Sequence, residues 1–269
     1  MSFDTQNPSH GRRASARRPY WTYERKKTGG ITHEDKGWEK KDVFSVIGES
    51  TVRQAVNAGI VAELLYVSDR PIPFEKKTQV TPEVMEYITL GRKTSLVAIC
   101  RKTEIPISAG GLHRILVLDR VEYRGNIGRI LNLSFCFGVD LVYYSEGDGT
   151  NYHARSIANA SQGASFFLPA RPANLPEKLR ELKAQGWYIV GTSLRDAVPL
   201  SGISAHDKMV FVVGNEQVGV SEEVLQATDV NCRIEMENYD SLNVAIATGI
   251  LLHRFRIQEG RFSKTNRRF

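Results

Sequence analysis

The side chains best suited to chemistry lie in three short segments between residues 126 and 244. They are Asn126-Ile127-Gly128, Gly214-Asn215-Glu216-Gln217-Val218-Gly219 and Ser241-Leu242-Asn243-Val244. Each segment follows an apolar run typical of a buried strand and leads into a helical pattern, so we expect it on a loop at the carboxyl end of a strand. Amide and carboxylate side chains there, with the free backbone amides of a helix start, could hold a polar or anionic ligand.

Each segment, taken alone, also has an ordinary conformational explanation. Glycine and asparagine recur in strand-to-helix turns, and Glu216 could simply cap a helix. Ser241 is a favourable N-cap, which would place Asn243 inside the first helical turn, where capping explains a polar side chain less readily. The combination of the three segments therefore carries more weight than any one of them.

The elements that must position these segments form two α/β units. The first is small, and the second begins with Ile115-Leu116-Val117-Leu118, an uninterrupted apolar run typical of a parallel strand buried on both faces. In the first unit we expect strands at 43–48, 64–67 and 96–100, a helix capped by Ser50 or Thr51, and a helix starting at Thr81-Pro82-Glu83. In the second we expect strands at 115–118, 139–144, 187–191, 209–213 and 232–236, and helices at 127–137, 176–185, 221–226 and 242–255.

This alternation of strands and helices predicts an α/β fold, with a mostly parallel sheet that has helices on both faces, preceded by the small α/β domain. The expected boundaries are a basic arm at 1–41, a small domain at 42–104, a linker at 105–112, a main domain at 113–257 and a basic tail at 258–269.

Positive charge is concentrated at the two ends of the chain. Residues 1–41 carry ten Lys/Arg against five Asp/Glu, a net +5. Residues 254–269 carry six Lys/Arg against Glu259 alone, another +5, so with +6 for the whole chain the middle is about −4. Basic tails often only keep a protein soluble, but aromatic side chains interleave with the basic ones at 20–27, as in nucleic-acid binders. Candidate RNA-binding residues are Arg12, Arg13, Arg17, Arg18, Arg25, Lys26 and Lys27 in the arm, and Arg92 and Lys93 in the small domain.

Composition excludes several other classes of protein. No apolar run reaches the length of a membrane span, and no apolar stretch follows the N-terminal arginines as in a secretory signal, so we expect a soluble, cytoplasmic protein. Cys100, Cys136 and Cys232 are far apart and lack CxxC spacing or clustered histidines. We therefore expect reduced, mostly buried thiols and no metal site.

The three segments, in this order and context, resemble the signature motifs of the SpoU-type (TrmH-like, SPOUT superfamily) RNA 2′-O-ribose methyltransferases. The resemblance covers roughly residues 113 to 257, and the part from Phe44 to Ile99 is similar to the ribosomal-protein-like RNA-binding domain that some members carry. That domain occurs in ribosomal RNA methyltransferases and in the thiostrepton-resistance group. Further matching segments are Leu118-Asp119-Arg120-Val121, Ser161-Gln162-Gly163-Ala164 with Pro169, and Ile234 and Met236 ahead of Ser241.

The resemblance implies a homodimer whose main domain contains a deep trefoil knot, an exception to ordinary chain topology. It implies S-adenosyl-L-methionine as cofactor, held in the knot largely by backbone groups, no metal, and RNA as substrate, with ribosomal RNA favoured over transfer RNA. The implied cofactor contacts are Thr192, Ser193, Leu194, Gly214, Asn215, Glu216, Gly219, Ile234, Met236, Ser241, Leu242 and Asn243.

The implied reaction is an in-line displacement in which a ribose 2′-hydroxyl attacks the sulfonium methyl. Because the sulfonium is already activated, positioning supplies much of the rate, with help in removing the hydroxyl proton. In the family that help is assigned to an arginine six residues after Asn126, assisted by Asn and Glu side chains such as Asn126, Glu216 and Asn243. Here that position is Asn132, which can neither act as a base nor supply positive charge.

Three interpretations follow from Asn132. Arg129, nearly on the same helix face, or Arg124 in the adjacent loop could deliver a guanidinium to the same space and preserve an active RNA methyltransferase, which we favour. Alternatively, the protein is an RNA-binding SpoU-like protein with weak or no methyl transfer. A small-molecule methyltransferase, or another α/β ligand-binding protein, is the third possibility.

Overall fold

The computed structural model describes most of the chain between the two basic ends. The described residues are 42–67, 74–108, 111–147, 152–238 and 242–256. The arm at 1–41, to which the sequence assigns RNA contacts, and the basic tail at 258–269 lie outside them.

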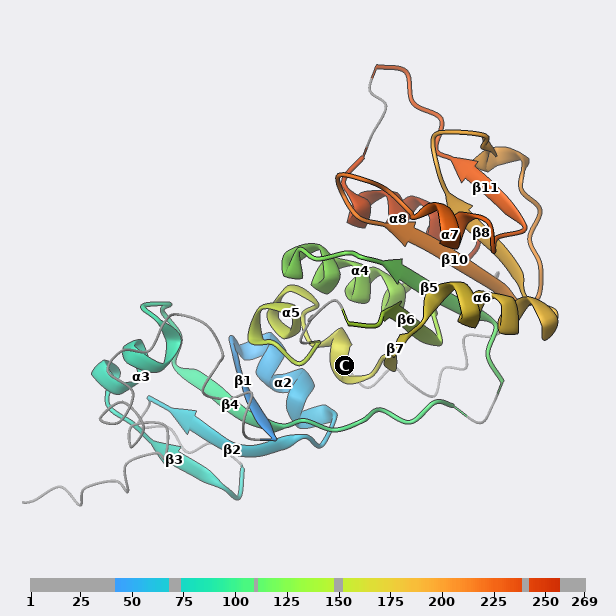
Figure 1. Cartoon of the computed structure of the whole chain (residues 1–269). Helices are drawn as coiled ribbons and strands as arrows, with labels where there is room; N and C mark the ends of the chain where they lie inside the picture. The colour runs from blue at the N-terminus through green and yellow to red at the C-terminus, as the bar shows by residue number, and fades with distance from the viewer. Residues whose placement is uncertain (1–41, 68–73, 109–110, 148–151, 239–241, 257–269) are drawn as a thin grey trace, which may run out of the picture.

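The chain forms two lobes, each built around its own sheet (Figure 1). The smaller one has strand order β1-β4-β2-β3, in which β4 is antiparallel to both neighbours and β3 is parallel to β2. One face of the sheet packs on α2 and the other on α3. Its elements are β1 (Val43–Ile47), α2 (Glu49–Asn57), β2 (Val61–Tyr66), β3 (Lys77–Gln79), α3 (Pro82–Thr89) and β4 (Leu96–Arg101).

Helix starts in this lobe follow local chemistry, and one expected start was wrong. Thr81 accepts a hydrogen bond from the backbone amide of Val84 at 3.4 Å, with Pro82 in the first helical position, as expected for α3. Helix α2, however, begins at Glu49 and has no side-chain cap. Gly48, with φ of 89°, turns the chain directly out of β1, so the helix starts before Ser50 or Thr51 could cap it.

The larger lobe contains a seven-stranded sheet in which every strand pair is parallel, with order β7-β6-β5-β10-β8-β11-β9. Its strands are β5 (Arg114–Asp119), β6 (Leu141–Ser145), β7 (Ala170–Ala173), β8 (Tyr188–Thr192), β9 (Val198–Pro199), β10 (Met209–Gly214) and β11 (Val230–Arg233). All residues of β5 and β10 are buried. The prediction of a parallel α/β sheet is confirmed.

Helices cover both faces of this sheet, also as predicted. Helices α4, α5 and α8 pack on the face that contains Leu116, Leu118 and Phe211, whereas α6 and α7 pack on the face that contains Ile115 and Val210. The helices are α4 (Arg124–Cys136), α5 (Arg155–Ala160), α6 (Leu175–Ala184), α7 (Glu222–Leu225) and α8 (Val244–Arg254), with short 3₁₀ turns at Ala164–Phe166 and Leu200–Gly202.

Several boundaries differ from those expected. Helix α4 begins at Arg124, so Asn126 lies in its first turn and not on the preceding loop. Strand β11 ends at Arg233, which leaves Ile234 and Met236 in the irregular segment that follows it. Helix α5 and strand β7 were not expected at all, because α5 has only six residues and no capping side chain.

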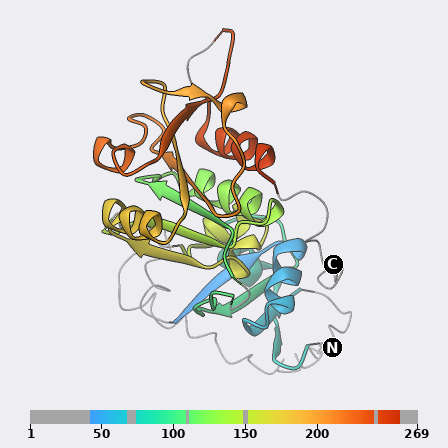
Figure 2. The ribbon, with the colours of Figure 1, turned by 90° about the vertical axis from the view of Figure 1, so that its right-hand side faces the viewer.

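The two lobes are joined through α5, which lies against β1 (Figures 1 and 2). Arg155 of α5 donates hydrogen bonds to Ser45 Oγ from Nε at 2.9 Å and to the Ile88 carbonyl at 3.2 Å. The backbone amide of Ile47 donates to Asn159 Oδ1 at 3.4 Å. Because Ser45 is buried in this contact, the position of the small lobe is tied to the same helix that packs on α4.

Two of the three cysteines are buried, which agrees with the expectation of mostly buried thiols. All three cysteines are free, and burial raises the pKa of Cys100 to about 12 and that of Cys232 to about 11. Cys136, the third cysteine, is exposed. Within the described residues, no helix combines the length and hydropathy needed to cross a membrane.

Candidate functional site

The candidate site lies where the chain leaves two adjacent strands in opposite directions. Strands β5 and β10 pair side by side, with Asp119 opposite Gly214 at their carboxyl ends. From β5 the chain continues through α4 to β6 on one side, and from β10 it continues through α7 to β11 on the other. Helices α4 and α7 cover opposite faces, so the two loops diverge at a topological switch point. Open α/β sheets bind ligands in the crevice at such a point, and this place is called the crevice below.

Three candidate catalytic residues meet in a hydrogen-bonded chain at this crevice. Asn243 Nδ2 donates to Asn126 Oδ1 at 3.2 Å, and Asn126 Nδ2 donates to Glu216 Oε1 at 2.6 Å. The Asn126 amide thus accepts from Asn243 and donates to the Glu216 carboxylate, as its carbonyl oxygen and amino group allow. The structure brings together side chains that are separated by 90 and 117 residues in the sequence.

Asn126 is the centre of this chain and is only 3% exposed. It occupies the first turn of α4, where its backbone amide donates to the Tyr123 carbonyl at 2.8 Å. Glu216 and Asn243, by contrast, are exposed. The buried amide therefore holds two exposed polar groups at fixed positions on the rim of the crevice, because leaving either of its polar atoms without a partner would cost free energy.

Asn243 has a double function that the sequence did not predict. Its Oδ1 accepts a hydrogen bond from the backbone amide of Ala245 at 3.0 Å, so Asn243 is itself the N-cap of α8. The expectation that it lies inside the first turn was wrong, because its ψ of 134° is not helical. With the oxygen used in capping, the amide nitrogen remains for Asn126. Ser241, the expected cap, lies outside the described residues.

The loop after β10 is shaped by Asn215 and two glycines. Asn215 Oδ1 accepts from the backbone amides of Gln217 at 2.9 Å and Val218 at 3.2 Å, which closes a tight turn. Gly219 has φ of 73°, and a Cβ on Gly214 would lie 2.3 Å from the carbonyl carbon of Gly219. Only glycine fits this close approach, so the loop that carries Glu216 is held in one tight conformation.

Two further contacts tie the loop after β5 to the chain that follows β10. Asn215 Nδ2 donates to the Arg120 carbonyl at 2.9 Å, and Asp119 Oδ2 accepts from the backbone amide of Ser221 at 2.6 Å. Asp119 is only 3% exposed. In the sequence, Asp119 was recognised only as part of a matching segment, with no role of its own. An acidic residue directly after the apolar run 115–118 was the signal that could have identified it.

The remaining candidate cofactor residues lie at the ends of the neighbouring strands β8 and β11. The Thr192 hydroxyl donates to the Val212 carbonyl at 3.0 Å, and Ser193 Oγ accepts from the Arg195 backbone amide at 3.1 Å. These hydroxyls therefore shape their own loop. Leu194 and Leu242 instead expose 57% and 38% of their surface, as apolar side chains that could cover a ligand.

The segment after β11 is attached to the loop before β10. Ser201 Oγ donates to Glu235 Oε1 at 2.5 Å, and this hydrogen bond lowers the pKa of the Glu235 carboxyl. Ile234 packs against the core beneath it, while Met236 is half-buried. The backbone of this segment is thus fixed at the same edge of the sheet as the β8 and β10 loops.

The structure places Asn132 away from the hydrogen-bonded chain. Its Nδ2 donates to the Ser161 carbonyl at 2.9 Å, at the C-terminal end of α5. Gly128, one turn earlier, faces the same helix, since a Cβ there would lie 2.4 Å from the Cβ of Ala160. Asn132 therefore belongs to the contact between α4 and α5. Arg129 is exposed and Arg124 is half-buried.

The candidate RNA-binding residues are only partly covered by the structure. Arg92 and Lys93 are exposed directly after α3 in the small lobe. The seven candidates in the arm lie outside the described residues. As for metals, no group of three or more His, Cys, Asp or Glu in the described part of the chain is arranged to hold an ion.

Comparison with known proteins agrees with the fold. Residues 113–253 match the model of the SpoU rRNA Methylase family. The chain is 29% identical over 232 residues to the 23S rRNA (guanosine(2553)-2′-O)-methyltransferase RlmP of Bacillus subtilis, covering 83% of this chain and 92% of that protein.

Solved structures show the same similarity over both lobes. An rRNA methyltransferase from Sinorhizobium meliloti is similar with a TM-score of 0.71 and 26% identity, over 82% of this chain and 89% of that one. The structure of an rRNA methyltransferase from that organism with bound AdoMet is similar with a TM-score of 0.71 and 25% identity over the same shares.

Proposed function

Because the chain belongs to the SpoU rRNA Methylase family, we propose that it is an S-adenosyl-L-methionine-dependent enzyme that methylates a ribose 2′-hydroxyl of ribosomal RNA. The observation that carries this proposal is the hydrogen-bonded chain from Asn243 through Asn126 to Glu216. It gathers one polar side chain from each of the three motif segments at the switch point between β5 and β10.

The residues around the crevice fit S-adenosyl-L-methionine in their chemistry. Apolar side chains of Leu194 and Leu242 are exposed on loops at this edge and suit the faces of an adenine ring. The Glu216 carboxylate suits the positive charge of the cofactor. When bound, the cofactor supplies an activated methyl group. The residues that would hold it are Thr192, Ser193, Leu194, Gly214, Asn215, Glu216, Gly219, Ile234, Met236, Ser241, Leu242 and Asn243.

Within this site, Asn126 and Asn243 position Glu216 beside the ribose hydroxyl, and the carboxylate accepts a hydrogen bond from that hydroxyl. Fixing the reacting groups in this way supplies most of the rate, since the donor is already activated. Acceptance of the hydroxyl proton by a positioned side chain contributes typically about 10²- to 10⁴-fold.

The positive charge that Asn132 lacks comes from an arginine of the same helix, Arg129 being the first choice and Arg124 the second. At 3.6 residues per turn, Arg129 lies roughly 60° around α4 from Asn126, whereas Arg124 lies roughly 160° away. Arg129 is also exposed, so its side chain is available to a substrate at the rim. A guanidinium near the 2′-hydroxyl favours its ionised form.

The RNA is held by the small lobe and by the basic arm. Arg92 and Lys93 present positive charge on the small lobe, and the arm adds Arg12, Arg13, Arg17, Arg18, Arg25, Lys26 and Lys27. Phosphate contacts of this kind supply affinity and not sequence specificity. Contact through α5 fixes the small lobe relative to the crevice, which supports a structured RNA as the substrate.

A homodimer and a trefoil knot complete the proposal. Ile246 and Ile250, one turn apart on α8, are 55% and 39% exposed. A second copy of the chain is the partner that would bury this apolar surface. The knot is implied by family membership, with the segment after β11 passing back to α8 beside α4.

The experiment that tests the function is methyl transfer from labelled S-adenosyl-L-methionine to deproteinised ribosomal RNA, followed by mapping of the 2′-O-methyl position. Incorporation at a ribose supports the proposal. Measurable cofactor binding with no incorporation into any RNA would instead favour an RNA-binding protein without methyl transfer.

A further inference from the structure

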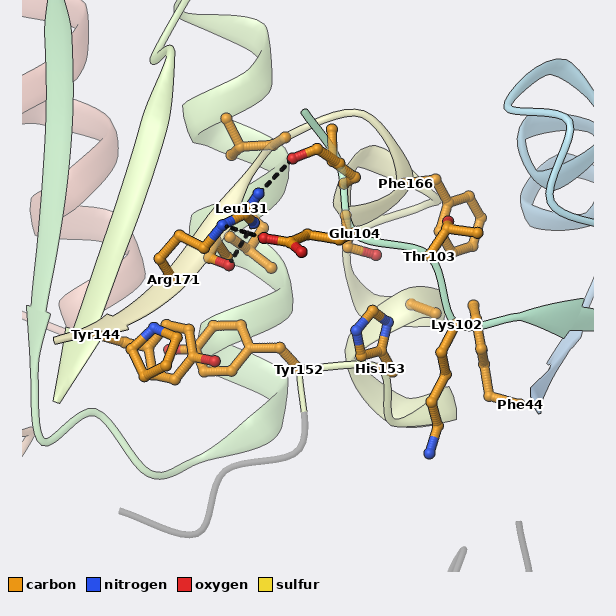
Figure 3. Close-up of a pocket in the computed structure, with 16 residues that line it drawn as sticks. Phe44, Lys102, Thr103, Glu104, Leu131, Tyr144, Tyr152, His153, Phe166 and Arg171 are labelled. Atoms are coloured by element: carbon orange, nitrogen blue, oxygen red, sulfur yellow. Dashed lines mark hydrogen bonds and ion pairs between the residues drawn. The ribbon is translucent and has the colours of Figure 1, made fainter. Parts of the chain in front are cut away.

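A cavity of about 370 Å³ lies where the two lobes meet, apart from the crevice described above (Figure 3). Its walls come from β1, the segment after β4, α4, β6, β7 and the loop that leads into α5. Neither Asn126 nor Glu216 nor Asn243 lines it. At the small end of the range of about 300–1,000 Å³ for small-ligand sites, it suits one compact planar group and not a large cofactor.

Aromatic rings form much of the wall of this cavity. Tyr144 and Tyr152 stack with ring centroids 3.8 Å apart and planes inclined by 19°. Phe44 brings the small lobe into the wall, with its ring centroid 5.9 Å from that of His153 and 6.0 Å from that of Phe166. Such faces bind nucleobases in single-stranded RNA, because every base has a π-face that stacks on aromatic side chains.

Polar groups at the cavity complement a nucleotide. Arg171 Nε pairs with Glu104 Oε1 at 2.9 Å, and Arg171 Nη2 donates to the Ile105 carbonyl at 2.6 Å, which holds the segment after β4 against β7. Lys102 precedes this segment and supplies positive charge suited to a phosphate. His153 is exposed as a residue, but its ring faces Phe44 and is partly desolvated. This desolvation, and next the charge of Lys102, lower the pKa of His153, so its neutral imidazole offers one donor and one acceptor to a base edge.

The charge around this cavity distinguishes it from a second hollow of about 590 Å³. That hollow lies on the other side of the β5 and β6 ends, and its lining includes Asp119, Glu146, Glu222 and Glu223. The four carboxylates outnumber Arg120, the one basic residue of that lining, and repel the RNA backbone. In the aromatic cavity Glu104 is paired with Arg171, and Lys102 adds a positive charge that attracts the backbone. Of the two, only the aromatic cavity fits a nucleic acid.

The aromatic cavity and the crevice share helix α4 and the carboxyl end of the sheet. Tyr144 of the cavity wall is the last residue but one of β6, and the loop that follows the neighbouring β5 leads to Asn126. Leu131, which lines the cavity, follows Asn126 by five residues on α4, or about 7.5 Å along the axis and roughly 140° around it. An RNA that reached both places would therefore pass around α4.

We propose that this cavity receives one unpaired nucleobase of the RNA substrate, stacked on the aromatic wall, with a neighbouring phosphate at Lys102. The inference rests on the proposed function, since it requires an RNA substrate. In this proposal the small lobe contributes an aromatic ring as well as charge. Phe44 of β1 lines the cavity because β1 packs against α5. Removing one ring from such a stack weakens binding about 5- to 150-fold.

The test compares the affinity of the full chain for deproteinised 23S ribosomal RNA among matched variants, at a salt concentration that suppresses non-specific phosphate contacts. Tyr152→Ala and His153→Ala remove rings from the wall, and Tyr152→Phe keeps the ring. Lys102→Ala removes the positive charge at the cavity. Lys208→Ala is its matched control, because it removes the same charge at an exposed position near Trp187, on the opposite edge of the sheet. Thermal melting and S-adenosyl-L-methionine binding are measured for every variant.

We expect Tyr152→Ala to bind the RNA about 5- to 150-fold more weakly, with His153→Ala and Lys102→Ala also weakened. Tyr152→Phe and Lys208→Ala should bind like the wild type, and all variants should retain cofactor binding. Wild-type affinity in Tyr152→Ala and His153→Ala would overturn the inference. His153 is exposed, so His153→Ala decides alone if Tyr152→Ala does not fold. A wild-type protein that binds cofactor but no RNA would contradict the proposed function itself.

Discussion

Asn126 and Glu216 are joined by a hydrogen bond of 2.6 Å between the amide nitrogen and the carboxylate oxygen, although they are 90 residues apart in the chain. One lies in the first turn of α4 after β5, and the other lies in the tight loop after β10. Because β5 and β10 are neighbouring strands, this bond links the two chain segments that leave the sheet in opposite directions. It fixes the Glu216 carboxylate beside the first turn of α4.

Replacing the two arginines near Asn126 should identify the one that compensates for Asn132. We expect Arg129→Ala to lower kcat by about 10²- to 10⁴-fold, the contribution typical of a group that assists proton transfer, with unchanged cofactor binding. Arg124→Ala should have the smaller effect, because Arg124 lies on a more distant part of the helix surface. Single-turnover transfer assays measure both. Wild-type rates in both variants would refute compensation by either residue.

Asn132 should matter for stability and not for chemistry. Its donated hydrogen bond to the Ser161 carbonyl is worth about 1 kcal/mol, so Asn132→Ala should lower Tm by about 2–4 °C. Asn132→Asp should be worse, because it places an acceptor against the carbonyl. Calorimetry gives the stabilities and a transfer assay gives kcat. If Asn132→Ala kept full stability yet abolished transfer, Asn132 would have to act in the reaction.

The basic arm should control the salt dependence of RNA binding. Residues 1–41 carry ten Lys/Arg, and each phosphate contact that they make contributes to the slope of log K against log salt. Deleting the arm should weaken binding and flatten that slope. The double variant Arg92→Ala/Lys93→Ala provides the comparison for charge on the small lobe. An unchanged slope after deletion would show that the arm does not bind RNA.

A charged side chain in the exposed apolar surface of α8, which Ile246 and Ile250 form, should dissociate the proposed homodimer. Ile246 is 55% exposed, and Ile246→Glu would place an unpaired carboxylate in the buried interface. Sedimentation velocity should then show a dimer for the wild type and a monomer for the variant. Ile107→Glu, at a position that is 43% exposed outside α8, serves as the matched control. A wild-type monomer at all concentrations would eliminate the dimer.

The parts of the fold that were predictable from the sequence are those with strong local signals. Apolar runs such as 115–118 and 209–213 are buried strands, and Thr81 and Pro82 mark a true helix start. Predictions from local sequence signals failed where the backbone conformation determines at which residue a helix starts. Gly48 starts α2 before any side chain can cap it, and Asn243 caps α8 because its ψ is not helical.

The candidate site was predictable as a set of segments but not as a geometry. The motifs identified Asn126, Glu216 and Asn243, yet nothing in their spacing indicates that Asn126 is the buried centre of a chain between the other two. In the same way, the bond from Asn132 to Ser161 depends on α5, a helix of six residues whose start carries no capping signal. Long-range contacts of this kind require the fold.

The most direct test of the central claim is a comparison of wild type and Asn126→Ala in labelled methyl transfer to deproteinised 23S ribosomal RNA. The wild type should place a methyl group on one ribose 2′-oxygen. Asn126→Ala should remain folded and bind the cofactor but lose at least about 10²-fold in kcat, because Glu216 and Asn243 lose their shared partner. Absence of transfer by the wild type, or an equal rate in the variant, would contradict the account.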